Sequence, residues 1–301
     1  MTIPLLLALI ALSRLLAGRW GPGHHLEFAE RVWRRRREML PATVARLLAE
    51  EKRAYFYGNL AADIINAKAY GGHLNHCHRW TIIDQMRELG HEPREEAFIL
   101  GYLSHLAADT IAHNHYVPYH LARYARARGL GHLYWELNAD RFVPVKRWDI
   151  VAQLKDDPEL DALDDLINRA VPKKALSMGT NKIIFNHVLL VSERKHWRSA
   201  VERIHPMRRV ALTKGFLSIF QKAAVARIRL ALHPRGVGKL HHIDTTGKRA
   251  QKEALALRRE LVASYPPGPE RDQASVQLAA RFLEGMNSPP ANSRNASPHW
   301  N

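Results

Sequence analysis

Two pairs of potential metal ligands stand out in the stretch from Phe98 to Glu136. His105 and Asp109 are four residues apart, and His132 and Glu136 repeat this spacing. On a helix, residues four apart share one face, about one turn from each other. Neutral imidazoles and carboxylates are good zinc ligands, and a helix can hold both at once. One such pair could arise by chance on an exposed helix, but two pairs in one short stretch predict a metal site.

The other residues that could bind a metal lie in the same part of the chain. Of the 18 histidines, 11 fall between His24 and His132. The single cysteine, Cys77, excludes an internal disulfide and a zinc site of the C-x-x-C type. Asp63 lies among apolar residues in YGNLAADII, where an unpaired carboxylate is costly to bury. We therefore expect Asp63 to cap a helix, to pair with a base or to bind a metal.

Composition and charge limit the class of protein. The 301 residues are 46% hydrophobic, enough for the core of one large domain or of one domain with extensions. The formal net charge is +16 and the isoelectric point is about 10.2. This balance favours polyanionic partners, namely nucleic acid, anionic lipid surfaces or phosphorylated substrates, without choosing between them. A basic surface that only keeps the protein soluble is the alternative.

The spacing of apolar residues predicts helices throughout and no alternating strand pattern. The sequence therefore predicts an all-α fold. A long helix is expected over 95–115, which Val117-Pro118 ends or restarts. Further helices are expected over 25–33, after Pro41, from Trp80 to about Gly90, and over 120–128, 132–142, 148–154, 159–167, 182–200, 205–232, 251–265 and 273–286.

Four segments are expected along the chain. Residues 1–19 contain an apolar run whose length suits a secretory signal peptide, with an uncleaved membrane anchor or a buried helix as alternatives. A signal peptide would make the protein secreted or periplasmic. Residues 20–142 form the ligand region. Residues 143–286 form a helical extension expected to pack on the same domain, cover the ligand helices and form the mouth of the site. Residues 287–301 are rich in Ser, Pro and Asn and are expected to be disordered.

Motifs with consistent spacing follow one another from Trp20 to about Phe142. They are WGPGHH, YGNLAAD, NHCH, SHLAAD and HLYWE, with His115 between the last two. In this order they resemble the zinc-dependent phospholipase C family, whose all-helical fold is shared with the fungal single-strand nucleases. The resemblance implies a phospholipase C or single-strand nuclease-like helical domain, with a helical C-terminal extension outside it. The positions that match the family's motifs are Trp20, His25, Asp63, His76, His105, Asp109, His115, His132 and Glu136.

The resemblance implies two or three zinc ions (Zn2+) held by these residues. Asp63, His76, His105 and Asp109 would hold the first ion. His115, His132 and Glu136 would hold the second, leaving a position for water or substrate. The third would bind the free amino group and carbonyl of Trp20 together with His25, and would share Asp109 with the first ion. It requires Trp20 to begin the mature chain, and Arg19 is a poor residue at the end of a signal peptide.

Neighbouring histidines leave several assignments open. His113 competes with His115, because it lies on the face of His105 and Asp109 if the helix continues. In the same way, His24 is an alternative to His25, and His73 and His78 are alternatives to His76.

The resemblance implies a hydrolase that cleaves phosphodiesters with a zinc-activated water. Asp63 is expected to act as both ligand and proton acceptor. Two features favour the phospholipase C type, which acts on phospholipid head groups at a membrane surface. The last ligand is Glu136, whereas the nucleases resemble a His-x-x-x-Asp pattern that ends in Asp. The nucleases also rely on disulfides, which a single cysteine cannot form. The first alternative is a nuclease of the same fold, with single-stranded nucleic acid as its substrate, which the charge of +16 would suit. The second is a membrane-tethered protein that binds metal or lipid without turnover.

Overall fold

The computed structural model describes residues 20–65, 77–124, 135, 138–140, 142–171, 178, 180–182 and 212–288. Throughout these ranges the regular structure is helical, and no strand occurs in them. The fold is all-α, as the sequence predicts. Several expectations lie outside the described ranges. They concern residues 1–19, residues 289–301 and the helix expected over 182–200, of which the first residue alone is described.

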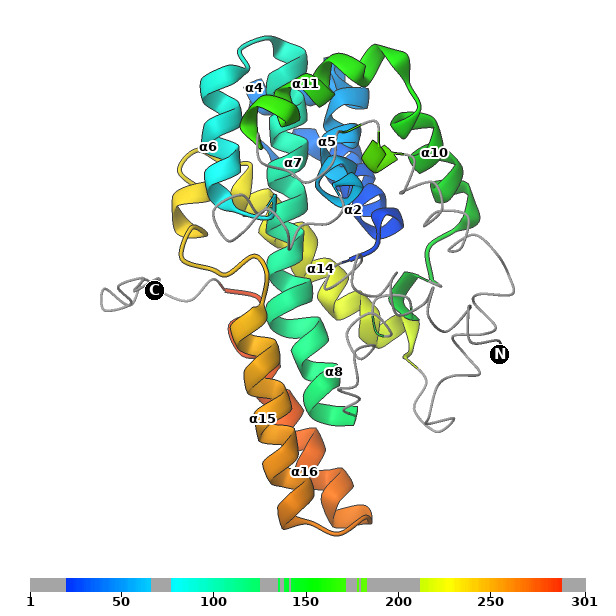
Figure 1. Ribbon diagram of the computed structural model, residues 1–301, viewed down its shortest axis with the longest axis vertical. Coiled ribbons are helices and arrows are strands. Elements are labelled where there is room, and N and C mark those ends of the chain that lie inside the picture. The colour runs from blue at the N-terminus through cyan, green and yellow to red at the C-terminus, as the bar shows by residue number, and fades with distance from the viewer. Residues whose placement is uncertain are drawn as a thin grey trace.

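Helix α7 (Pro93–Ile111) is the central element of the fold. It begins at a capping box in which the Glu92 side chain accepts from the first turn and Glu95 accepts from the Glu92 backbone, with Pro93 at the first helical position. From Ala97 to Ile111 every residue is buried. A helix that is buried on all sides must have neighbours around it, and Figure 1 shows α7 running through the middle of the molecule.

The neighbours of α7 come from both ends of the chain. Helices α5 and α14 make its most extensive contacts, and α2, α4, α6 and α11 also pack on it. Helix α10 packs on α2 and α5 instead. The bounds of these elements are α2 (Pro22–Arg34), α3 (Arg36–Met39), α4 (Ala42–Glu50), α5 (Lys52–Ile64), α6 (Trp80–Leu89), α10 (Val145–Lys155), the 3-10 turn η4 (Pro158–Leu160), α11 (Asp161–Ala170) and α14 (Lys214–Ala231).

Two glycines allow α5 and α7 to approach closely. A Cβ atom on Gly58 would lie 2.1 Å from the carbonyl oxygen of Phe98, and a Cβ on Gly101 would lie 2.1 Å from that of Tyr55. No larger residue fits at either position without moving the helices apart. This contact matters for the site because Asp63 lies on α5, whereas His105 and Asp109 lie on α7.

A π-helical turn, η3 (Ala112–Tyr116), joins α7 directly to α8 (Val117–Tyr124). Val117-Pro118 therefore restarts a helix without an intervening loop, which is one of the two outcomes expected from the sequence. Proline has no N–H, and its ring crowds the carbonyl four residues earlier, so the preceding turn is a natural place for the wider π geometry. The side chain of Asn114 donates to the carbonyl oxygens of Thr110 (2.9 Å) and Asp244 (2.7 Å), which ties the π turn to the C-terminal region.

The C-terminal region packs on the rest of the molecule. Helices α15 (Lys248–Ser264) and α16 (Pro269–Ala280) lie beside α8 and form the narrow end of the molecule in Figure 1. The short turns η5 (Val237–Lys239) and η6 (Arg281–Leu283) flank this pair. Among the residues that the structure describes, no helix combines the length and the apolar character needed to cross a bilayer.

Candidate metal centre

Four buried side chains from three parts of the chain converge beside α7. Asp63 comes from the last turn of α5, His78 from the segment before α6, and His105 and Asp109 from successive turns of α7. None of the four is more than 4% exposed. Two carboxylates and two imidazoles in an apolar core are costly unless something compensates their polarity.

The spacing of the four ligand atoms fits a tetrahedral metal ion. The Nε2 atoms of His78 and His105 lie 3.0 Å apart, and they lie 3.3 and 3.2 Å from Asp109 Oδ2. Asp63 Oδ1 lies 3.9 Å from His78 Nε2 and 3.7 Å from His105 Nε2. A tetrahedron with zinc–ligand bonds of about 2.0–2.1 Å has edges of about 3.3 Å, which falls inside this range. The residues present therefore fit a zinc ion.

The second oxygen of Asp109 faces His25. Asp109 Oδ1 lies 3.3 Å from His25 Nε2, and the imidazole of His25 stacks on that of His105 with ring centroids 3.8 Å apart. In the part of the chain that the structure describes, neither oxygen of Asp109 and neither ring nitrogen of His25 aligns for a regular hydrogen bond. Fully buried polar atoms in this state are where a cation would bind. Asp109 thus lies between two groups of ligands, and His25, His105 and Asp109 form a second set that could share an ion.

The electrostatics favour the protonation states that metal binding needs. Burial, followed by the nearby His105, lowers the pKa of His25, so its imidazole is neutral. Burial alone would raise the pKa of Asp109. The surrounding His105 and His113 outweigh burial and hold the pKa of Asp109 well below its ordinary value. A neutral imidazole on His25 and an ionised carboxylate on Asp109 are the states in which these two side chains bind zinc.

Hydrogen bonds to backbone carbonyls orient three of the histidines. Nδ1 of His105 donates to the carbonyl oxygen of Asn59 (2.9 Å), that of His113 to Thr245, and that of His115 to Phe282 (2.8 Å). A carbonyl oxygen only accepts, so Nδ1 carries the proton and a neutral imidazole leaves its Nε2 lone pair for a metal. Metal-binding histidines usually have such a partner on the other ring nitrogen.

The structure brings several of the predicted ligands together. His25, Asp63, His105 and Asp109 lie in the cluster. Three others, His76, His132 and Glu136, lie outside the described residues, and their roles stay predictions. His78, one of the two alternatives to His76 named above, lies in the cluster, and the other alternative, His73, is also outside the described residues.

Of the two candidate histidines in the π turn, His113 is the one seen next to Asp109. Its Nε2 lies 3.9 Å from Asp109 Oδ2. His115 is held by the carbonyl of Phe282, and burial lowers its pKa to about 4, so it is neutral at pH 7. The structure does not choose between the two as zinc ligands, because the other residues of that set, His132 and Glu136, are not described.

Trp20 and His24 lie beside the cluster. The indole of Trp20 is buried, donates to the carbonyl oxygen of Ala108 (3.2 Å) and stacks on Tyr116. His24 is paired through Nδ1 with the carboxylate of Asp140 at 2.8 Å and belongs to neither of the two groups, His25/His105/Asp109 and Asp63/His78/His105, that could hold a metal. Of the two neighbouring histidines, the one in contact with Asp109 is His25, the residue that the resemblance assigns to a zinc ion.

Asp140 and Thr245 lie around the cluster, Asp140 as the partner of His24 and Thr245 as the partner of His113 and His78, and the sequence reasoning did not identify either. Asp140 continues the four-residue spacing of His132 and Glu136, so that periodicity could have drawn attention to it. Thr245 supports the centre twice, because its carbonyl accepts from His113 and its hydroxyl donates to the carbonyl of His78. It carries no sequence signal, because its role depends on its backbone and on tertiary packing.

Comparison with known families agrees with this all-α fold and its buried His/Asp centre. The family model for zinc-dependent phospholipase C matches residues 24–177. The chain therefore belongs to the zinc-dependent phospholipase C family. The match extends past Phe142, where the recognisable motifs end. Searches of curated proteins and of solved structures found no match.

Proposed function

We propose that the protein is a zinc-dependent phosphodiesterase that hydrolyses the head groups of phospholipids in the manner of a phospholipase C. Membership of the family supports zinc-dependent phospholipase chemistry. The observation that carries the proposal for this chain is the convergence of Asp63, His78, His105 and Asp109 at the spacing of a tetrahedral zinc site.

The cluster gives each of its residues a role in this proposal. Asp63, His78, His105 and Asp109 would hold one zinc ion, and Asp109 would use its second oxygen, with His25, for another. The amino group of Trp20 completes that second set if Trp20 begins the mature chain. A further ion would bind His132 and Glu136 with His115 or His113. When bound, zinc lowers the pKa of a coordinated water towards neutrality and offsets the charge of a phosphodiester.

Asp63 is our candidate for the proton acceptor. A carboxylate that binds a metal through one oxygen can accept a proton on the other. Asp63 suits this role because it is the most loosely placed of the four ligands. Its Oδ1 lies 3.7 Å from His105 Nε2 and 3.9 Å from His78 Nε2, farther than Asp109 Oδ2 lies from either atom. Loss of the carboxylate should therefore lower kcat more than it lowers zinc content.

Several features favour phospholipid over nucleic acid as the substrate. Family membership points to phospholipids. Glu136 stands where the related nucleases have Asp, and the chain has one cysteine. We also propose that residues 1–19 direct the chain out of the cytoplasm or anchor it. The region 143–286 would then belong to the same domain, since Thr245 and Phe282 orient His113 and His115.

The experiment compares hydrolysis by the zinc-loaded protein on phosphatidylcholine vesicles and on single-stranded DNA. Release of the phosphorylated head group should be lost in His105→Ala and Glu136→Ala and kept in His91→Ala, a matched control at an exposed histidine. Cleavage of DNA alone would replace the phospholipase proposal with the nuclease alternative. A zinc-loaded protein that is inactive on both substrates would favour a binding function.

The same assay separates His113 from His115. Whichever of the two is the zinc ligand, its replacement by Ala should give a protein that holds about one zinc ion fewer per chain and has lost most of the activity. Loss of metal in both variants would mean that both imidazoles contribute, which is compatible with their shared orientation by C-terminal carbonyls.

A further inference from the structure

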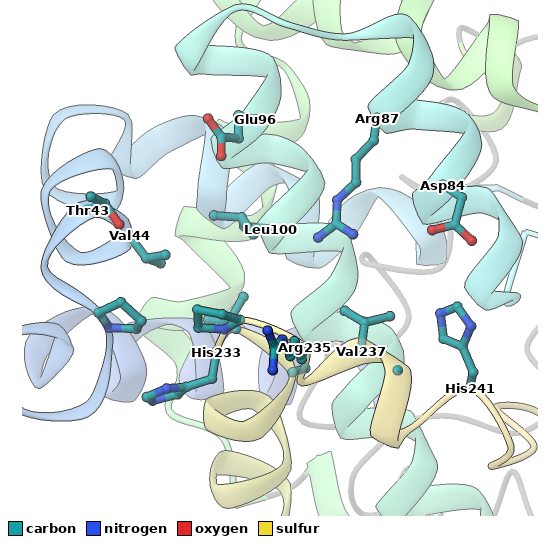
Figure 2. A pocket seen from close by; sticks show the side chains of 15 residues that line it. Thr43, Val44, Asp84, Arg87, Glu96, Leu100, His233, Arg235, Val237 and His241 are labelled. Carbon is teal, nitrogen blue, oxygen red and sulfur yellow. The ribbon is translucent and has the colours of Figure 1, made fainter.

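A cavity of about 460 Å³ lies away from the metal centre, between α4, α6, α7 and the segment that follows α14. Figure 2 shows the side chains that line it. Its volume is within the usual range of small-molecule sites, about 300–1,000 Å³. None of the proposed zinc ligands lines this cavity. Leu100 lines it from α7, and His105 follows five residues later, about 140° further around the helix.

Two arginines face this cavity from different elements. Arg87 reaches into it from the last turn of α6, and Arg235 lies on the opposite side in the segment after α14 (Figure 2). Within the described part of the chain, neither guanidinium takes part in a salt bridge or a side-chain hydrogen bond. Both side chains are exposed, and an anion bound between them would be attracted by two positive charges.

The backbone at Arg235 has an unusual conformation. Arg235 has φ of 60°, the one left-handed non-glycine residue among those the structure describes. It follows Pro234 in a turn closed by a hydrogen bond from Gly236 N to His233 O at 2.9 Å. Glycine or asparagine is preferred at such a position, so arginine there costs backbone energy. Residues held in sparsely populated conformations gather at functional sites.

The remaining lining is mostly apolar and aromatic, which suits the organic part of a phosphate ester, and it also contains two carboxylates. His241 lines one end and stacks on Trp80, with ring centroids 6.1 Å apart. Apolar side chains, including Val44, Leu100 and Val237, line the interior. The two acids of the lining, Asp84 and Glu96, lie towards the two ends of the cavity in Figure 2, with Arg87 between them.

We propose that Arg87 and Arg235 form a binding site for a phosphate group, separate from the metal centre. The planar guanidinium presents paired N–H donors that match two phosphate oxygens, and two such forks could bind one phosphate from opposite sides. The phosphate belongs either to a soluble phosphate ester or to the head group of a lipid. Because the site shares no residue with the metal centre, this proposal stands or falls independently of the catalytic one.

The test measures phosphate binding by the zinc-loaded full chain. Inorganic phosphate and phosphocholine are titrated calorimetrically, and vesicles with and without phosphatidic acid are tested by co-sedimentation. The variants are Arg87→Gln and Arg235→Gly, and the latter also relieves the left-handed backbone, so it should fold at least as well as the parent. Arg229→Gln is the matched control, because it removes one exposed positive charge from α14 outside the cavity.

The proposal expects each cavity variant to bind phosphate about three- to tenfold more weakly than the parent, and the control to match the parent. The parent, the two cavity variants and the control share any phosphate that binds at zinc. A difference in phosphate affinity between them therefore reports binding at the arginine site. Saturation by phosphocholine identifies a soluble ester, whereas an arginine-dependent response to phosphatidic acid vesicles alone identifies a lipid head group. Equal binding by all four proteins, or an equal loss in Arg229→Gln, would overturn the proposal.

Discussion

Substitution of Gly101 by Ala should damage the metal centre from a distance. The new Cβ would lie 2.1 Å from the carbonyl oxygen of Tyr55, whereas ordinary contacts begin at 3.4 Å. Helices α5 and α7 must therefore separate locally by about 1 Å. Overpacking of this kind costs about 1–3 kcal/mol, and replacing a helical glycine returns about 0.5–1 kcal/mol. The free energy of unfolding should therefore fall by about 0–2.5 kcal/mol, with about 1 kcal/mol near the middle of that range.

The same separation of the two helices should also weaken zinc binding. Asp63 lies on α5, and His105 and Asp109 lie on α7, so a separation of about 1 Å moves ligands relative to one another. Metal sites tolerate deviations of about 0.2 Å in ligand distance. Zinc affinity, measured by competition with a chromophoric chelator, should fall at least about tenfold.

The control for this prediction is Gly215→Ala near the start of α14. A Cβ there has no atom within 4 Å, so the variant should be as stable as the parent or slightly more stable. Denaturant unfolding of both variants provides the comparison. If Gly101→Ala unfolds at the same denaturant concentration as the parent and retains its zinc affinity, the close contact of the two helices does not position the centre.

Two further predictions concern residues around the centre. Thr245→Val removes the hydroxyl that donates to the buried carbonyl of His78, so the free energy of unfolding should fall by about 1–3 kcal/mol and zinc should be held more weakly. Thr43→Val, at an exposed position, is the control. Equal zinc retention in both variants would argue against a supporting role for Thr245. Burial lowers the pKa of His120 from 6.5 to about 3, with the hydrogen bond to Tyr116 as a partial offset. From pH 6.5 down to about 3 the unfolded chain therefore binds the extra proton, and the free energy of unfolding falls by up to about 1.4 kcal/mol per pH unit. Urea unfolding at pH 7, 6 and 5 should show a shallower fall for His120→Phe than for the parent, and identical slopes would contradict the assignment.

The features that depend on helical periodicity could be predicted from the sequence. The spacing of His105 and Asp109 places both on one face of a helix, and the structure has them on successive turns of α7 with His105 Nε2 3.2 Å from Asp109 Oδ2. The acid in an apolar setting, Asp63, is indeed found among imidazoles. Helical geometry alone brings His105 and Asp109 together, whereas the imidazoles around Asp63 come from other elements through tertiary packing.

The features that depend on tertiary packing could not be predicted in this way. A π turn at Ala112–Tyr116 alters the helical phase between Asp109 and the two histidines after it, so counting residues does not rank His113 against His115. The presence of His78 in the cluster depends on how the segment before α6 returns to α7. The carbonyls of Thr245 and Phe282 act through backbone atoms that are common to every residue.

Zinc stoichiometry tests the central claim most directly. The protein is produced in a secreting host, its N-terminal residue is sequenced, and zinc per chain is measured by elemental analysis in the parent and in Asp109→Asn. The bridging position of Asp109 predicts two or three zinc ions in the parent and the loss of more than one ion in the variant, with three ions if Trp20 is the first residue. A folded parent without zinc, or a variant that keeps the full complement, would contradict the proposed centre.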